Sequence, residues 1–175
     1  MRILGIDPGL GITGYGAIET SGQDIRVIEA GIIRSNPKQN LERRLSEIYR
    51  KIVSLLKDIT PDVVVLEELF SHYKHPRTSI FMAHARGIIC LAIQEQGLRL
   101  VNYPTTRIKK AITGRGHASK QQMQRTVTSL LNLKDIPSIT DITDALALAL
   151  THANVCSHSI KEDFYQDRFF SRRRR

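Results

Sequence analysis

Residues 1–16 read MRILGIDPGLGITGYG, a short apolar run followed by a carboxylate and a glycine-rich turn. An apolar run bounded by turn residues predicts a buried strand. The glycines at 9 and 11 permit positive φ, so the chain can reverse there into a second strand over residues 12–19. A carboxylate at the end of a buried strand is costly without a partner, so Asp7 points to a bound cation. An ordinary Asp-Pro-Gly turn would also account for this residue.

Length and composition indicate one soluble domain. The chain has 175 residues, 41% hydrophobic and 25% charged, which is ordinary for a globular domain with its own core. No apolar stretch approaches the roughly 18 residues of a membrane span, and the N-terminus enters a strand directly, without a signal peptide. Cys90 and Cys156 lie in helical apolar patterns, which predicts buried thiols in a reducing compartment. We therefore expect a cytoplasmic protein with no membrane association.

The remaining pattern predicts a third strand and then alternating helices and strands. Residues 25–33 form the third strand, and connections this short predict an antiparallel meander. Asn36-Pro37 suits a helix cap and first helical position, so a helix is expected from there to Pro61. The later elements are strands at 62–67 and 98–103 and helices at 77–96, 105–112, 119–131 and 141–156. The expected fold is α/β, with a mixed five-stranded sheet (an antiparallel meander plus two further strands) flanked by helices.

Basic charge is concentrated in one stretch and in the tail. The chain has 26 Lys and Arg against 17 Asp and Glu, a net charge of +9. Residues 96–134 contain eight basic residues and no acidic one, and the chain ends in four arginines. Such clusters favour nucleic acid as a partner, although a solvated basic face would look the same. We expect one domain over residues 1–156, then a basic, flexible tail over 157–175, where no period is visible.

Acidic residues stand at the ends of several predicted elements. Asp7 and Glu67 end two strands, at the edge where α/β sheets place their sites. Asp141 and Asp144 share one face of the first turn of the last helix, although helix capping and the helix dipole would explain that pair alone. If this helix docks at the same edge, four hard oxygen ligands converge, which suits Mg²⁺ or Mn²⁺ better than zinc. Glu68 follows Glu67 and faces the other way, so only one of them can join the site.

Several motifs of this chain occur together in one known family. They are Asp7 in GIDPG, Glu67 in VLEELF, Asp141 and Asp144 in DITDALA, Gly-Tyr-Gly at 14–16, Ala-Arg-Gly at 85–87, and Ser119-Lys120. In order and spacing they resemble RuvC-type Holliday junction resolvases, and the likeness covers essentially residues 1–156. The resemblance implies an RNase H-like fold, a homodimer and a two-metal endonuclease for four-way DNA junctions. It also implies cooperation with the RuvA–RuvB branch-migration complex in recombinational repair.

The resemblance also assigns roles to individual residues. The four carboxylates would hold two Mg²⁺ ions, with Mn²⁺ as a possible substitute and Asp7 as the ligand that both ions share. Lys120 would lie nearest the scissile phosphate, and Lys109 would make a further phosphate contact. Phe70 matches an aromatic residue that presses on bases at the junction centre, although a core phenylalanine closing the strand would also fit. The expected DNA-binding residues are Phe70, Lys109, Lys110, Arg115 and Lys120.

The helix expected over residues 77–96 has two apolar arcs, whereas covering one face of a sheet needs only one. The broader arc, which we expect on the sheet, contains Phe81, Met82, Ala85, Ile88, Ile89, Ala92 and Ile93. The second arc carries the small residues Ala83, Gly87 and Cys90, so another helix could approach it closely. We expect these residues to form the interface of a two-fold homodimer. A loop or the tail of the same chain could cover the arc instead.

Two other classes of function are alternatives to a nuclease. A non-catalytic junction-binding or DNA-binding module explains the basic stretch but gives no reason for four acids at one sheet edge. An actin-like-fold phosphotransferase shares the Asp-x-Gly opening but needs a second nucleotide-binding half, for which 175 residues leave little room. The function that the resemblance implies is therefore the expected one: a metal-dependent endonuclease that resolves four-way junctions by paired symmetric nicks, leaving 5′-phosphate and 3′-hydroxyl ends.

Overall fold

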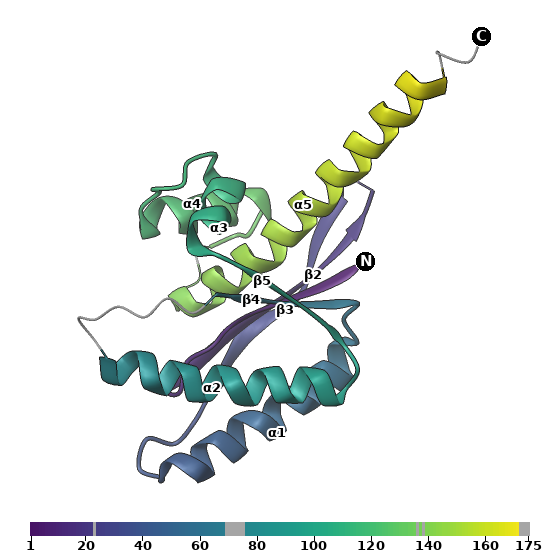
Figure 1. The fold of residues 1–175 in the computed structure, drawn as a ribbon. Coiled ribbons are helices and arrows are strands. Elements are labelled where there is room, and N and C mark those ends of the chain that lie inside the picture. The colour runs from purple at the N-terminus through teal and green to yellow at the C-terminus, as the bar shows by residue number, and fades with distance from the viewer. Residues whose placement is uncertain (23, 69–75, 136, 138, 172–175) are drawn as a thin grey trace.

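In the computed structural model the chain folds around one five-stranded sheet with helices on both faces (Figure 1). The structure describes residues 1–22, 24–68, 76–135, 137 and 139–171, except for the side chains of 76 and 158–171. The strands are β1 (Arg2–Asp7), β2 (Ile12–Ser21), β3 (Asp24–Arg34), β4 (Val63–Glu67) and β5 (Arg99–Tyr103). The helices are α1 (Leu41–Ile59), α2 (Pro76–Glu95), α3 (Thr105–Thr113), α4 (Lys120–Leu130) and α5 (Thr140–Ser171).

The strand order is β3-β2-β1-β4-β5, so β1 lies at the centre of the sheet. β1 pairs antiparallel with β2 and β2 with β3, which confirms the predicted meander. β4 runs parallel to β1, and β5 runs parallel to β4. The predicted mixed sheet is therefore confirmed. Because β1, β4 and β5 are parallel, their carboxyl ends share one edge, and the residues that end them become neighbours.

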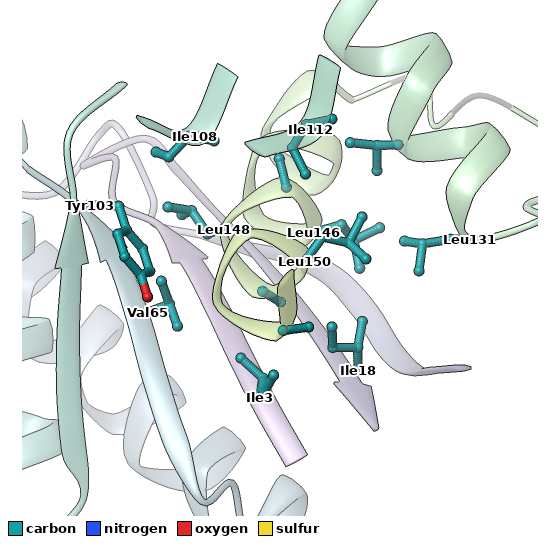
Figure 2. Close-up of a cluster of buried hydrophobic side chains, with 14 of the residues drawn as sticks. Ile3, Ile18, Val65, Tyr103, Ile108, Ile112, Leu131, Leu146, Leu148 and Leu150 are labelled. Atoms are coloured by element: carbon teal, nitrogen blue, oxygen red, sulfur yellow. The ribbon is translucent and has the colours of Figure 1, made fainter. Parts of the chain in front are cut away.

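The sheet separates two cores, because successive strand residues face opposite ways. Leu4 and Ile6 of β1 are fully buried on the face that α1 and α2 cover. Ile3 and Val65 point to the other face, where they pack with leucines of α5 (Figure 2). α3 and α4 complete this second core by adding Ile108, Ile112, Met123 and Val127 from outside α5. Both faces of β1 are thus shielded from water, so core packing holds the strand that carries Asp7 in place.

α5 lies unusually close to the sheet because glycines face it. A Cβ atom on Gly5 would lie 2.0 Å from the backbone oxygen of Ala145, and one on Gly14 would lie 2.1 Å from that of Asp141. Real Cβ atoms do not tolerate such distances, so only glycine allows this approach. Gly14 is also the pairing partner of Asp7. The glycines of the opening stretch therefore set the first turn of α5 directly over the end of β1.

The structure corrects two predicted helix boundaries. α1 begins at Leu41, after Asn40, and not at Asn36-Pro37. The side-chain oxygen of Asn36 accepts the backbone N–H of Lys38 at 3.0 Å, so this residue closes a turn instead of capping a helix. α5 continues to Ser171, whereas the pattern predicted an end near Cys156. Residues 141–175 contain no glycine or proline, so nothing in the sequence stops the helix there.

The structure also shows the start of α4, the burial of the two cysteines and the character of the long helices. The predicted helix at 119–131 is present as α4, and it begins with a capping box of reciprocal hydrogen bonds between Ser119 and Gln122. Cys90 and Cys156 are free thiols but only half-buried, so the prediction that they are buried was wrong. Cys90 packs against the margin of the core that α1 and α2 cover, so its side chain is covered only in part. Among the described helices, none is long and apolar enough to cross a membrane.

Candidate active site

The four carboxylates named from the sequence belong to three elements that meet at one edge of the sheet. Asp7 is the last residue of β1 and Glu67 the last of β4, and these strands are parallel neighbours. Asp141 and Asp144 lie in the first turns of α5, which packs on β1 and β2. All three of the other acids lie close enough to Asp7 to act on its charge. The fold therefore brings the four carboxylates together.

Asp7 is strongly perturbed by this setting. Burial raises its pKa from 3.8 to about 7, and the negative charges of Asp144, Asp141 and Glu67 add to the rise, whereas Lys120 opposes it. A buried carboxylate among like charges is stabilised by a bound cation, and a set of aspartate and glutamate oxygens suits Mg²⁺ or Mn²⁺. Within the described part of the chain, no three acids, histidines or cysteines already stand in metal-binding geometry. The donor chemistry fits a divalent ion, which would draw mutually repelling oxygens inward.

Lys120 is the basic residue that meets this acidic cluster. Its Nζ lies 3.1 Å from Oδ2 of Asp144. Burial raises the pKa of Asp144, and the ammonium group of Lys120 works against that rise. Lys120 is the first residue of α4, whose start is held by the capping box of Ser119 and Gln122. The lysine is therefore presented to the carboxylates by a well-anchored helix end, although its own side chain remains largely exposed.

Glu67 is held by two neighbouring elements. The Thr105 hydroxyl, at the start of α3, donates a hydrogen bond to its carboxylate Oε1. Arg86 of α2 donates to the backbone oxygen of Glu67 at 3.3 Å and to Oδ1 of Asn102 at 2.6 Å, so it ties α2 to the ends of β4 and β5. Glu68 is exposed, and its backbone N–H donates to the backbone oxygen of Tyr103 at 2.9 Å. Of the two adjacent glutamates, Glu67 is therefore the one that faces the acidic cluster.

A cavity of about 220 Å³ opens at this point. Its polar lining consists of Asp7, Glu67, Asp144, Thr105, Lys109 and Lys120. Its floor is apolar and is formed by residues of α3, α4 and α5, including Ile108 and Leu148. A wider hollow of about 720 Å³ runs along α1, but its carboxylate, Glu47, is already paired with Lys51 at 2.7 Å. The smaller cavity, which combines three acids with two lysines, has the chemistry of a metal-assisted phosphate site.

The remaining predicted DNA-binding residues lie outside this cavity or outside the described chain. Lys110 is exposed near the end of α3, and Arg115 is exposed in the loop that follows. The backbone of Arg115 is held by Thr113, whose hydroxyl donates to its oxygen at 3.0 Å. Neither residue lines the cavity, so both could contact DNA only beyond the reacting phosphate. Phe70 lies outside the described residues.

The two arcs of α2 differ in burial, but Met82 and Ile88 of the broader arc are only half-buried. Ala85, Ile89, Ala92 and Ile93 of the broader arc are buried, but Phe81 is 40% exposed, so its predicted place on the sheet was wrong. Burial begins only at Ala85 because the first turns of α2 extend past the core. On the second arc, Ala83 and Gly87 are exposed and Cys90 is half-buried, and a Cβ on Gly87 would meet nothing within 4 Å. Leu91 on the same arc is 48% exposed.

The sequence reasoning missed two contacts at the site. Thr105 carried no signal apart from its position after Pro104 at a predicted helix start, and its link to Glu67 depends on the pairing of β4 with β5. Arg86 stood in the Ala-Arg-Gly motif, but its bonds to the ends of β4 and β5 are likewise non-local. Neither contact follows from local sequence alone.

The chain matches one known family over most of its length. The family model described as crossover junction endodeoxyribonuclease RuvC matches residues 3–152. The chain is 44% identical over 156 residues to the crossover junction endodeoxyribonuclease RuvC of Rhodopirellula baltica, which covers 89% of this chain and 85% of that protein. The RuvC of Thermosipho melanesiensis is 44% identical over 149 residues, covering 85% of this chain and 94% of the relative.

Solved structures agree with these sequence matches. Thermus thermophilus RuvC in complex with Holliday junction substrate superimposes with a TM-score of 0.84 at 29% identity, covering 91% of this chain and 96% of that chain. The fold is thus the RNase H-like fold of RuvC structures, which places the chain in that class of α/β proteins. Within the class, the chain belongs to the RuvC family of crossover junction endodeoxyribonucleases. The resemblance drawn from the motifs is confirmed.

Proposed function

We propose that this protein is a divalent-metal-dependent endonuclease that resolves four-way DNA junctions by a pair of symmetric nicks. Membership of the RuvC family supports this function, as does the close likeness to a RuvC structure that holds a Holliday junction substrate. The observation that carries the proposal is the cluster of Asp7, Glu67 and Asp144 in one cavity with two lysines. A module that only bound DNA would gain nothing from placing acids where they repel phosphate.

The residues that would hold the metal ions are Asp7, Glu67, Asp141 and Asp144. Asp7 is the central one, because its carboxylate interacts electrostatically with all three of the others. When bound, two Mg²⁺ ions (or Mn²⁺ in their place) would supply an activated water and charge stabilisation at phosphorus, which yields 5′-phosphate and 3′-hydroxyl ends. The carboxylates themselves would fix the positions of these charges, because each is anchored at the end of a strand or in the first turns of α5.

The lysines of the cavity would hold the scissile phosphate. Lys120 Nζ lies 3.1 Å from a carboxylate of the cluster, so its charge is within reach of a phosphate bound against the acids. Lys109 lines the same cavity from α3. Exposed basic residues beyond the cavity, including Lys110 and Arg115, would contact flanking phosphates and make binding dependent on salt. Phe70 keeps its proposed place at the junction centre on the strength of the resemblance alone.

Paired nicking calls for two equivalent sites, which a two-fold homodimer provides. The second arc of α2, centred on Ala83, Gly87 and Cys90, is our proposed interface. Its small residues leave open space above the helix, and Leu91 and Ile80 beside them are 48% and 55% exposed. Burial of apolar side chains of this size under a second copy would stabilise the dimer. The RuvA–RuvB complex as a partner, and the cytoplasm as the compartment, rest on family membership and on the DNA substrate.

Mapping the cuts on a synthetic four-way junction tests this function. We expect Mg²⁺-dependent nicks at matching positions on two opposite strands, no nicks in EDTA, and little cutting of a linear duplex with the same sequence. Equal cutting of junction and duplex would contradict junction selectivity. Binding of the junction with no cutting under any divalent metal would favour the non-catalytic alternative.

A further inference from the structure

Thr105 contributes a hydroxyl group to the candidate active site, where every other polar lining residue is a carboxylate or a lysine. It is the first residue of α3, and its hydroxyl donates a hydrogen bond to Oε1 of Glu67. The same residue lines the cavity that holds Asp7, Asp144 and the two lysines. A neutral hydrogen-bond donor in this place contacts one proposed metal ligand and leaves the charge of the site unchanged.

The fold holds Thr105 in this position from both sides. Glu67 pairs with Tyr103 across β4 and β5, and Pro104 then leads straight into α3, so the helix starts beside the end of β4. Ile108, one turn later, is buried against the core around Leu148 of α5 (Figure 2). Because strand pairing fixes one end of this connection and core packing fixes the other, the backbone of Thr105 is held beside the end of β4, within hydrogen-bonding reach of Glu67.

We propose that Thr105 is a positioning residue for Glu67, which orients the carboxylate so that its other oxygen, Oε2, faces the proposed metal site. A glutamate side chain rotates freely about its last bond, and a hydrogen bond to one oxygen selects the rotation that presents the other. Partners that orient a metal ligand typically change metal affinity by about 10- to 100-fold when they are removed. This inference rests on the proposed function, because Glu67 must be a metal ligand for its orientation to matter.

A purely structural role for this hydroxyl does not fit its surroundings. The start of α3 is closed by the oxygen of Pro104, which accepts the backbone N–H of Arg107 at 2.9 Å and that of Ile108 at 3.2 Å. The α3 cap uses no side-chain hydrogen bond, so Thr105 is not needed to begin the helix. The bond to Glu67 is also exposed to solvent, where a hydrogen bond contributes little net stability.

The test is direct binding of Mn²⁺ to the DNA-free, full-length protein, measured by titration calorimetry. Thr105→Val keeps the shape of the side chain and removes the donor, whereas Thr105→Ser keeps the donor. Thr106→Val is the matched control, because Thr106 is the next residue, is also exposed and does not line the cavity. We expect Thr105→Val to weaken Mn²⁺ binding by about 10- to 100-fold. Thr105→Ser and Thr106→Val should bind Mn²⁺ like the wild type, and circular dichroism should be alike in all.

Three results would overturn the inference. Mn²⁺ binding by Thr105→Val that matches the wild type is the simplest of them. Equal weakening in Thr105→Ser would show that the methyl group, and not the hydroxyl, is responsible. Loss of junction affinity with unchanged Mn²⁺ binding would make Thr105 a phosphate contact instead. Glu67→Gln separates this inference from the proposed function: if it too binds Mn²⁺ normally, the metal site itself is misplaced.

Discussion

Removal of the Asp7 charge should make the metal-free protein more stable while it destroys the proposed active site. In the folded chain the pKa of Asp7 is raised to about 7, chiefly by burial and then by the neighbouring acids. The folded state therefore keeps a proton between pH 4 and 7 that the unfolded state has already released. Because the folded state binds more protons, its stability falls as pH rises through this window and stays reduced above it.

The size of the effect follows from the shift of about three pKa units, each worth about 1.4 kcal/mol. Asp7 should cost the fold about 4 kcal/mol at pH 8, where it is ionised in the folded state, and about 2 kcal/mol at pH 5, where the folded state keeps it protonated. Asp7→Asn has no charge at either pH, so it escapes this penalty. In EDTA, the free energy of unfolding of the variant should exceed that of the wild type, and the excess should grow by about 2 kcal/mol between pH 5 and pH 8.

Urea denaturation in EDTA at several pH values measures this difference. Asp24→Asn is the matched control, because Asp24 is an exposed aspartate at the opposite end of the strands. Addition of Mg²⁺ should then stabilise the wild type but not Asp7→Asn, since a ligand that binds only the folded state raises its stability by mass action. Parallel stability curves for wild type and Asp7→Asn from pH 5 to pH 8 would refute the electrostatic reasoning.

Three further outcomes follow from the packing and charge of the site. Gly5→Ala should lower the free energy of unfolding by at least about 2 kcal/mol, because its Cβ would lie 2.0 Å from the oxygen of Ala145; a neutral effect in urea denaturation would mean that α5 does not press on β1. Lys120→Ala should lower the single-turnover cleavage rate far more than junction affinity, since one charge matters most where negative charge develops at phosphorus. Equal losses in both would make Lys120 an ordinary backbone contact. Ala83→Arg combined with Gly87→Arg should give folded monomers by light scattering that no longer make paired nicks, and a variant that stays dimeric would exclude this face of α2 as the interface.

Most of the fold was predictable because local patterns determine most of its elements. The meander follows from three strands whose connections leave no room for a crossover, and the buried face of α2 follows from apolar spacing. Phe81 shows where this reasoning stops, because helical spacing gives the face of a residue but not how far the core extends along the helix. The length of α5 does not follow from the pattern for a related reason: the apolar period fades after Cys156, but the segment beyond it contains no glycine or proline to break the helix.

The acids of the candidate site were named from the sequence because each stands at the end of a predicted element. Their convergence depends on glycines that let α5 rest on the sheet, and the sequence pattern presents those glycines only as turn residues. The Thr105 contact was beyond local reasoning, because it exists only through the register that pairs Glu67 with Tyr103. Residues that act through non-local pairing therefore need the structure to be recognised.

Junction binding and junction cleavage by Asp7→Asn, measured side by side in Mg²⁺, test the central claim most directly. The carboxylate of Asp7 interacts with all of the other site acids, while the basic residues that would bind DNA lie on α3, α4 and the loop between them. We predict that the variant binds a four-way junction at least as tightly as the wild type and makes no detectable nick. Cleavage by Asp7→Asn at the wild-type rate would contradict a metal-dependent site at the end of β1.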